Sequence, residues 1–133
     1  MSTRTNDLTL TMRERDLAHN VVAAAKTLGW RVYFTWNSLH SPKGWPDLVA
    51  LRQRFDGDTR IIFAELKSEK GKLSLPQEQT LELLRGTGHE VYVWKPSQWV
   101  SGEIAEILAG GYSRSRRGEC RPLALGQLRR DVR

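Results

Sequence analysis

The sequence predicts an α/β fold, a mixed four-stranded sheet flanked by helices in the order α-β-β-β-α-β-α. Three observations lead to this fold. Apolar residues recur at helical spacing near the N-terminus. Further along, two segments rich in β-branched and aromatic residues flank an Asp56-Gly57 turn and so form an antiparallel hairpin. A second helical segment then separates this hairpin from a fourth strand, and a helical crossover of this kind makes the sheet mixed.

The first helix is predicted over residues 11–28. Thr11 suits its N-cap, and Gly29 suits its stop. The inward face of this helix is set by residues that recur at helical spacing, namely Glu14, Leu17, Val21, Ala25 and Leu28.

Three strands follow this helix. Residues 31–36 (RVYFTW) are β-branched and aromatic, so they predict the first strand. Residues 37–45 form a polar loop that contains a proline and a glycine. The hairpin strands are predicted over residues 47–52 and 60–67, and the second of them begins apolar and ends with charge.

The remaining elements are helical apart from one strand. Ser74 can cap a helix over residues 74–86, with Pro76 in its first turn and Gln77, Leu81 and Leu84 on one face. Residues 90–94 (EVYVW) predict the fourth strand, and residues 97–108 predict a closing helix. Beyond them, the pattern fits a flexible arm with a short helix around residues 123–128.

Length and charge suggest one domain with a basic tail. The chain has 133 residues and a mass of 15.2 kDa, enough for a modest core. From Gly110 onward it carries a net charge of +5, whereas the first 109 residues carry only +1. We therefore expect a domain over residues 1–109 and an Arg-rich tail over residues 110–133. Such a tail suits phosphate contacts, and a merely solvated end explains its charge equally well.

The composition limits the kinds of site and location. No apolar run approaches the roughly 20 residues that span a bilayer, and the N-terminus does not resemble a signal peptide. A soluble, cytoplasmic location is therefore expected, with no membrane partner. The single cysteine, Cys120, excludes an intrachain disulfide, and the three histidines lack the spacing of a zinc centre. Any metal must be held by carboxylates, which favours Mg²⁺ or Mn²⁺.

The chemistry is concentrated where the hairpin strands meet the preceding loop. Side chains alternate along a strand, so Glu65 and Lys67 point to the same face. If the strands pair around the Asp-Gly turn, Asp47 lies opposite them. Two carboxylates and a lysine then converge, although each alone is also explained by a strand-end aspartate or an exposed ion pair.

This set of residues suits phosphodiester hydrolysis. Asp47 and Glu65 can share a divalent ion that neutralises a phosphate and lowers the pKa of a bound water. Lys67 can orient that water and stabilise the charge that develops on the phosphoryl group. The backbone carbonyl of Leu66 is a further candidate ligand for the metal.

The same residues resemble the PD-(D/E)XK nuclease superfamily, and within it the VRR-NUC family, whose pattern is G-x-P-D-L, then E-x-K, then L-S-x-x-Q. Holliday-junction resolvases of archaeal type share that core and are more distant. The resemblance covers about residues 13–99 and implies a restriction-endonuclease-like fold. The matching residues are Gly44, Pro46, Asp47, Leu48, Glu65, Lys67, Leu73, Ser74 and Gln77.

The resemblance implies two further site residues. A glutamate on the first helix completes the metal shell in the family, and Glu14 occupies that place. Thr11 and Glu14 also have the spacing of a capping box, which needs no metal. Gln77 is implied in the active site, and with Ser74 it has the same capping spacing.

Contacts with DNA are expected around this centre. Loops of this kind border the substrate groove in the family, and a Lys/Gly-rich loop follows the third strand; a simple solvated loop is the alternative in both cases. The candidate DNA-binding residues are Asn37, His40, Lys43, Lys70 and Lys72. Three tryptophans, Trp36, Trp45 and Trp94, are interpreted as core or interface residues rather than base-stacking platforms.

Together these patterns predict a Mg²⁺-dependent endonuclease that cuts DNA in a structure-dependent manner, on branched or duplex substrates. Stand-alone members of the family are often homodimers, and small forms resemble phage or mobile-element proteins. The resemblance therefore implies a homodimer and a phage-like source in a bacterial host. The alternative is a non-catalytic DNA-binding module that retains the fold. A weaker third reading is a protein-interaction domain whose basic tail binds RNA or acidic partners.

Overall fold

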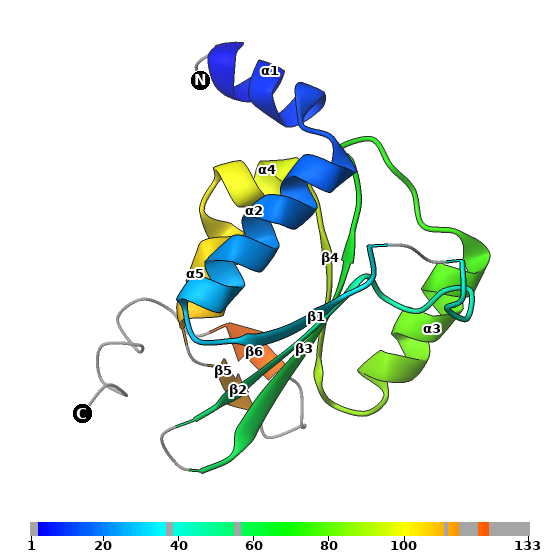
Figure 1. Cartoon of the computed structure of the whole chain (residues 1–133), viewed down its shortest axis with the longest axis vertical. Helices are drawn as coiled ribbons and strands as arrows, with labels where there is room; N and C mark the ends of the chain where they lie inside the picture. Colours follow the sequence, from blue (N-terminus) through cyan, green and yellow to red (C-terminus); the bar gives the residue numbers. More distant parts are fainter. Residues whose placement is uncertain (1–2, 37–38, 55–56, 111, 115–119, 123–133) are drawn as a thin grey trace.

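The computed structural model describes residues 3–36, 39–54, 57–110, 112–114 and 120–122, and side chains only within residues 7–110 (Figure 1). Each element has the residue types that its geometry favours. Three of the helices, α2, α3 and α4, begin at the polar residues Arg13, Ser74 and Lys95, and the strands of the main sheet are rich in Val, Ile, Tyr and Phe. In chain order they are α1 (Thr3–Thr11), α2 (Glu14–Thr27), β1 (Arg31–Phe34), β2 (Leu48–Gln53), β3 (Thr59–Leu66), α3 (Leu75–Arg85), β4 (Glu90–Trp94), α4 (Pro96–Val100), α5 (Glu103–Ala109), β5 (Tyr112–Arg114) and β6 (Cys120–Pro122).

The main sheet has four strands in the order β1-β2-β3-β4. β1 and β2 pair antiparallel, as do β2 and β3, whereas β3 and β4 pair parallel. In the β2–β3 hairpin Leu48 lies opposite Ala64, and in the parallel pair Leu66 lies opposite Trp94. The predicted fold class, a mixed four-stranded sheet flanked by helices, is confirmed.

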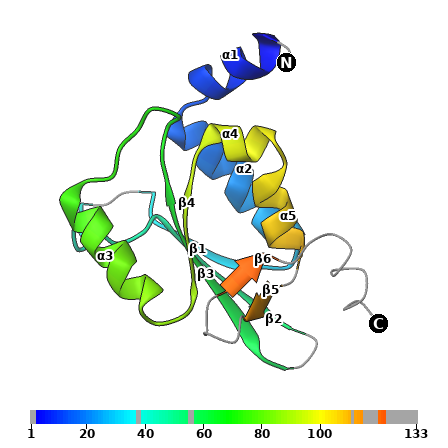
Figure 2. The ribbon, with the colours of Figure 1, turned by 180° about the vertical axis from the view of Figure 1, so that it is seen from behind.

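Helices cover both faces of this sheet, but unequally. α2, α4 and α5 lie together on one face, and α3 lies on the other, as the views from the front and from behind both show (Figures 1 and 2). α1 extends from the start of α2 and lies beside α4.

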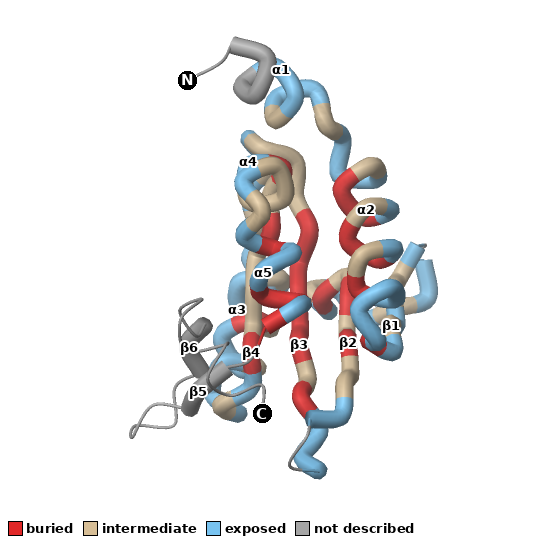
Figure 3. Tube along the Cα trace, turned by 90° about the vertical axis from the view of Figure 1, so that its left-hand side faces the viewer, coloured by how far each residue is buried: buried red, intermediate tan, exposed pale blue. Residues whose placement is uncertain are grey.

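The core lies between the sheet and the three-helix layer. Ile62, Ala64 and Leu66 alternate along β3 and are fully buried in one cluster with Leu17 and Val21 of α2. Figure 3 shows the buried residues running along β3, between β2 and β4. Because side chains alternate on a strand, Glu65 belongs to the opposite face, which α3 partly covers.

The first predicted helix is in fact two helices. Thr11 ends α1, and its hydroxyl donates a hydrogen bond back to the carbonyl of Asp7 (2.7 Å), so it is not an N-cap. α2 begins instead at Glu14, where the carboxylate of Asp16 accepts from the backbone N–H of Arg13 (3.2 Å). The predicted Thr11/Glu14 capping box is therefore wrong.

The closing helix is also divided. α4 ends at Val100 and α5 begins at Glu103, because Gly102 adopts a left-handed conformation with φ of 86°. Near the C-terminus, β5 and β6 pair antiparallel in a separate two-stranded sheet, where a flexible arm was expected. The short helix predicted over residues 123–128 lies outside the described residues. Within the described part of the chain, no helix is long and apolar enough to cross a bilayer.

Candidate active site

Asp47 is fixed at the point where β2 begins. Its backbone carbonyl accepts from the N–H of Thr35 (2.9 Å), which continues the pairing of β1 with β2. Its side-chain Oδ2 accepts from the N–H of Leu66 (2.9 Å), at the end of β3. The carboxylate thus bonds the backbone between Glu65 and Lys67, so the predicted approach of Asp47 to these two residues is observed.

Glu65 is the buried carboxyl group of the site. Its residue surface is only 1% exposed. Oε1 accepts a hydrogen bond from Nε2 of Gln77 (2.8 Å) and lies 3.7 Å from Nζ of Lys67. Oε2 is buried, and no residue that the structure describes donates a hydrogen bond to it. An exposed ion pair is therefore excluded as the explanation of Glu65 and Lys67.

These surroundings make it costly for Glu65 to ionise. Burial, then the negative charge of Asp47 and a hydrogen bond with it, raise the pKa of Glu65 to about 8, although Lys67 acts in the opposite direction. A hydrogen bond between two carboxyl groups requires a proton, so the ionised form leaves Oε2 without a partner. When both Asp47 and Glu65 are ionised, the pair has more negative charge than Lys67 neutralises, and a bound cation would balance it.

Gln77 both caps a helix and contacts the site. Its Oε1 accepts from the N–H of Ser74 (2.9 Å), and its own N–H donates to the hydroxyl of Ser74 (3.3 Å), so the predicted capping box is present. Its Nε2 remains available and donates to Glu65. The two interpretations of Gln77 are therefore compatible, because the amide has a separate atom for each.

The loop that ends at Asp47 is packed directly onto α3. Gly44 adopts φ of 91°, and a Cβ built there would lie 2.3 Å from the carbonyl oxygen of Pro76 and 2.8 Å from Oγ1 of Thr80. Only glycine allows this approach. Gly44, the glycine of the G-x-P-D pattern, thus lets the loop that ends at Asp47 pack against the first turn of α3, which carries Gln77.

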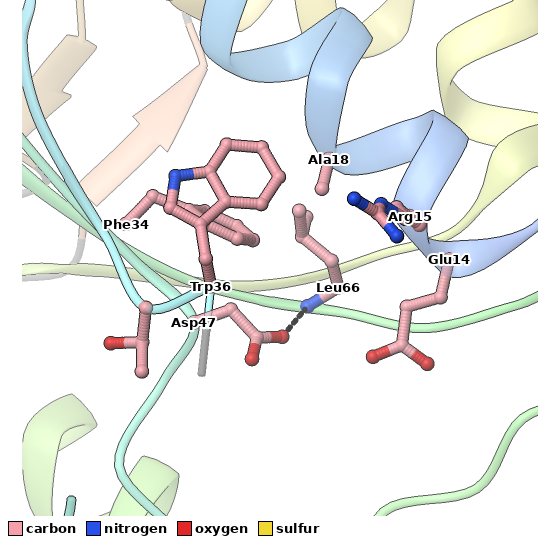
Figure 4. Close-up of a pocket in the computed structure, with 8 residues that line it drawn as sticks. Glu14, Arg15, Ala18, Phe34, Trp36, Asp47 and Leu66 are labelled. Atoms are coloured by element: carbon pink, nitrogen blue, oxygen red, sulfur yellow. Dashed lines mark hydrogen bonds between the residues drawn. The ribbon is translucent and has the colours of Figure 1, made fainter. Parts of the chain in front are cut away.

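A cleft opens beside Asp47 on the α2 side of the sheet, with a volume of ≈ 460 Å³. In Figure 4 the carboxylates of Glu14 and Asp47 flank its opening, and the indole of Trp36 forms another part of its wall. Burial raises the pKa of Glu14, Lys67 lowers it, and Asp47 raises it further, so Glu14 lies within electrostatic reach of both. The lining residues are Glu14, Arg15, Ala18, Phe34, Thr35, Trp36, Asp47 and Leu66.

The donor set fits a hard divalent cation. Asp47 and Glu65 supply two adjacent carboxylates, and the buried Oε2 of Glu65 lacks the positive partner that such an ion provides. No three His, Cys, Asp or Glu side chains gather at ligand distance among the residues that the structure describes. Glu14 stands at the cleft opening, and its role as a metal ligand stays a prediction, as does that of the Leu66 carbonyl.

The predicted DNA-binding residues that the structure describes lie outside this cleft. His40, Lys43, Lys70 and Lys72 are exposed, and none of them lines it. Asn37 falls outside the described residues.

Sequence reasoning missed two residues at the cleft, Arg15 and Trp36. Trp36 was grouped with core or interface residues, yet 55% of its surface is exposed. Trp45 is 46% exposed, whereas Trp94 is fully buried. The signal was available in part: Trp36 directly precedes the loop that leads to Asp47. For Arg15 the only signal was its position next to Glu14.

The comparisons with known proteins point to one family. The family model described as "VRR-NUC domain" matches residues 4–98. A solved structure titled "VRR_NUC domain" is 26% identical, with a TM-score of 0.56, and the match covers 68% of this chain and 92% of that one. No curated protein matches the chain.

Proposed function

Since this chain belongs to the VRR-NUC family of the PD-(D/E)XK superfamily and so carries a nuclease-type domain, we propose that it is a Mg²⁺-dependent endonuclease that hydrolyses DNA phosphodiester bonds. One observation carries the proposal: a buried carboxyl group, Glu65, is placed against Asp47 and Lys67 with one oxygen left without a donor. A buried carboxylate with no function would only destabilise the fold. A carboxylate that binds a catalytic cation near a phosphate explains why Glu65 stands there.

Asp47 and Glu65 are the residues that would hold the cation, with Glu14 and the Leu66 carbonyl as further oxygen ligands. VRR-NUC nucleases generally use a divalent metal, and we propose Mg²⁺, or Mn²⁺ in its place. When bound, such an ion neutralises the phosphate and makes a coordinated water more acidic.

The protein's own groups position the reaction. The Leu66 N–H and the Gln77 amide orient the two carboxylates, so little reorganisation is needed when substrate binds. The ammonium of Lys67 lies beside Glu65, where it can hold the attacking water and stabilise charge on the phosphoryl oxygens. The water oxygen bonds to phosphorus and gives its proton to solvent, while the bond from phosphorus to the leaving sugar oxygen breaks and that oxygen takes a proton from solvent.

The finer features of the function belong to this proposal. We assign the nuclease domain to residues 1–109 and the Arg-rich tail to residues 110–133. The proposed substrate is branched or duplex DNA, and His40, Lys43, Lys70 and Lys72 are proposed to grip its backbone. A homodimer would place two active sites for paired cuts.

The test is cleavage of supercoiled plasmid and labelled branched DNA with Mg²⁺ or Mn²⁺. We expect wild type to cut and Lys67→Ala to lose at least about 100-fold in rate, the usual effect of removing a charge-stabilising group. Lys26→Ala is the matched control, because Lys26 is an exposed lysine in the last turn of α2 and does not line the cleft.

Two outcomes would reject the proposal. If wild type binds the DNA but does not cut it with either metal, the chain is a non-catalytic DNA-binding module. If Lys67→Ala and Lys26→Ala cut equally well, the nuclease centre lies elsewhere.

A further inference from the structure

Trp36 presents an aromatic ring to the cleft beside Asp47. It lies two residues beyond the end of β1, lines the cleft, and is 55% exposed. Exposing so large an apolar ring is unfavourable, by about 25 cal/mol for each Å² left in water. Trp36 also does not stand alone, because Phe34 lines the same cleft beside it, and contiguous apolar surface in a groove marks a ligand site.

The ring is held in place by two others. The centroid of the Trp36 ring lies 4.4 Å from that of Phe34 and 4.7 Å from that of His19 on α2. These contacts support the indole from the strand and from the helix. Because its orientation is set before any ligand arrives, a planar group can stack on it with little further loss of conformational freedom.

A cation and the proposed metal-binding carboxylate share this cleft with the ring. Arg15, an exposed residue of the first turn of α2, lines the cleft with Trp36 and Asp47, as Figure 4 shows. An arginine suits a phosphate oxygen, and an indole face suits a base. A phosphodiester that reaches Asp47 therefore brings its neighbouring nucleotide to Trp36 and Arg15.

We propose that Trp36 and Arg15 form a subsite for an unpaired nucleobase and its phosphate, next to the bond that is cut. This inference rests on the proposed nuclease function and names the class of DNA that it selects. In an intact duplex both faces of a base are covered by its neighbours, so it has no free face for the indole. At a flap, a gap or a branch point the exposed base stacks on Trp36, irrespective of sequence, because every base has a π-face.

The test is binding of two DNAs that differ only in pairing: a duplex with 2-aminopurine inside it, and a flap with 2-aminopurine in the first unpaired position. Ca²⁺ replaces Mg²⁺, since it takes the same kind of oxygen ligands, and a gel checks that the DNA stays intact. We expect Trp36→Leu to weaken flap binding by roughly 5- to 150-fold, the usual contribution of one stacked base. In wild type, stacking on Trp36 should quench the fluorescence of the unpaired 2-aminopurine in the flap. Trp36→Leu should abolish this quenching and leave duplex binding unchanged.

Tyr33→Leu is the matched control. Tyr33 lies on β1, the strand that precedes Trp36, and is 56% exposed, but it does not line the cleft. Tyr33→Leu should change neither the flap affinity nor the duplex affinity. Trp36→Phe, which keeps an aromatic ring, should retain part of the preference for the flap. Arg15→Gln should weaken flap binding without affecting the quenching.

Three results would overturn the subsite. The first is that Trp36→Leu binds the flap as tightly as wild type does, and the second is that it loses affinity equally for flap and duplex. The third is that wild type sediments as a dimer and Trp36→Leu as a monomer. The last result would assign the ring to a second copy of this chain. Plasmid cleavage with Mg²⁺ decides the nuclease function separately, so a cutting enzyme without a flap preference rejects the subsite alone.

Discussion

At the scale of single residues, Glu65 combines a structural cost with a chemical use. Its pKa is raised to about 8, so near neutral pH its proton and a bound cation compete for the same oxygens. The unfolded chain gives up that proton near the ordinary value of 4.5. Between these two values the folded protein binds more protons than the unfolded one, and its stability falls as the pH rises.

We therefore expect Glu65→Gln to stabilise the metal-free protein at high pH while abolishing cleavage. Glutamine keeps an acceptor for Gln77 and carries no charge to bury. The melting temperature at pH 9 should rise by at least about 3 °C, roughly the effect of 1 kcal/mol in a domain of this size. The difference from wild type should shrink as the pH falls below 8 toward 5.

Thermal unfolding in EDTA across this pH range measures the effect. Glu78→Gln provides the control, because Glu78 is an exposed carboxylate on α3. A Glu65→Gln advantage that is the same at every pH would contradict the assignment of the destabilisation to ionised Glu65.

Gln77 allows its two contacts to be separated by mutation. Ser74→Ala removes the hydroxyl that accepts the Gln77 N–H but leaves both side-chain hydrogen bonds of Gln77, so we expect a loss of about 1 kcal/mol in stability and little loss of rate. Gln77→Ala keeps its N–H bond to the Ser74 hydroxyl but removes the side-chain bonds to the Ser74 N–H and to Glu65, and the cleavage rate should also fall by about 10- to 100-fold. Urea unfolding and single-turnover cleavage report the two effects. An equal loss of rate in both variants would show that Gln77 acts only through the helix.

At the scale of elements, the loop before β2 and the first turn of α3 behave as one unit. Gly44→Ala should be destabilising by at least about 2 kcal/mol, because a Cβ would meet the carbonyl of Pro76 and the left-handed conformation is itself strained. Gly29→Ala is the matched control: its φ is 88°, but nothing lies within 4 Å of its Cβ position. It should lose only about 1 kcal/mol.

Urea unfolding compares the two alanine variants. Cleavage by Gly44→Ala, measured where it is still folded, should fall because Asp47 moves relative to Gln77. Equal losses of stability in the two variants would mean that backbone strain, and not the contact with α3, sets the need for glycine at position 44.

The elements that the sequence predicted well are those with local signals. β4 was predicted with its observed bounds, Glu90–Trp94, because it is a short run of β-formers between a turn and a proline. α3 was placed within one residue at each end, because Ser74, Pro76 and Gln77 form a cap that can be seen in the sequence. Asp47, Glu65 and Lys67 were placed together by the hairpin register alone.

The misses have non-local or weak signals. The break between α1 and α2 has no glycine or proline, and Thr11 satisfies both a helix end and a helix start in sequence terms. Gly102 was visible, but an isolated glycine is tolerated in many helices, so its left-handed turn was not predicted. The contact of Trp36 with His19 depends on how α2 crosses β1, which no local pattern gives.

At the scale of the whole molecule, a buried cluster of polar side chains connects the end of α5 to the sheet by hydrogen bonds. Arg60 of β3 forms a two-pronged ion pair with Glu90 of β4, with N···O distances of 2.6 and 2.7 Å. The same guanidinium donates to the carbonyls of Ile107 and Gly110 at the end of α5. Trp30 adds a further bond, to the carbonyl of Leu108 (2.8 Å). The carbonyls of Ile107, Leu108 and Gly110 are thus satisfied by the side chains of Arg60 and Trp30.

Arg60→Met should destabilise the protein by about 3–5 kcal/mol, because it leaves Glu90 buried without its cation. Burial already raises the pKa of Glu90, so the variant should lose most of its stability at high pH and recover part of it in acid. Arg85→Met is the control, because Arg85 forms an exposed ion pair with Glu82 at an N···O distance of 3.7 Å. We expect this variant to lose less than about 1 kcal/mol in stability. Similar losses for the two variants in urea unfolding would contradict an anchoring role for the buried pair.

The hydrogen bond from the Leu66 N–H to Asp47 has a consequence for how the site can be observed. The Leu66 amide proton lies between the two strands that carry the carboxylates, and the amide donates it to Oδ2 of Asp47. A cation drawn to that oxygen weakens the bond, so the amide resonance should shift and its hydrogen–deuterium exchange should accelerate. One backbone proton therefore reports occupancy of the centre by nuclear magnetic resonance, in a solution that contains no DNA and in which no bond is cut.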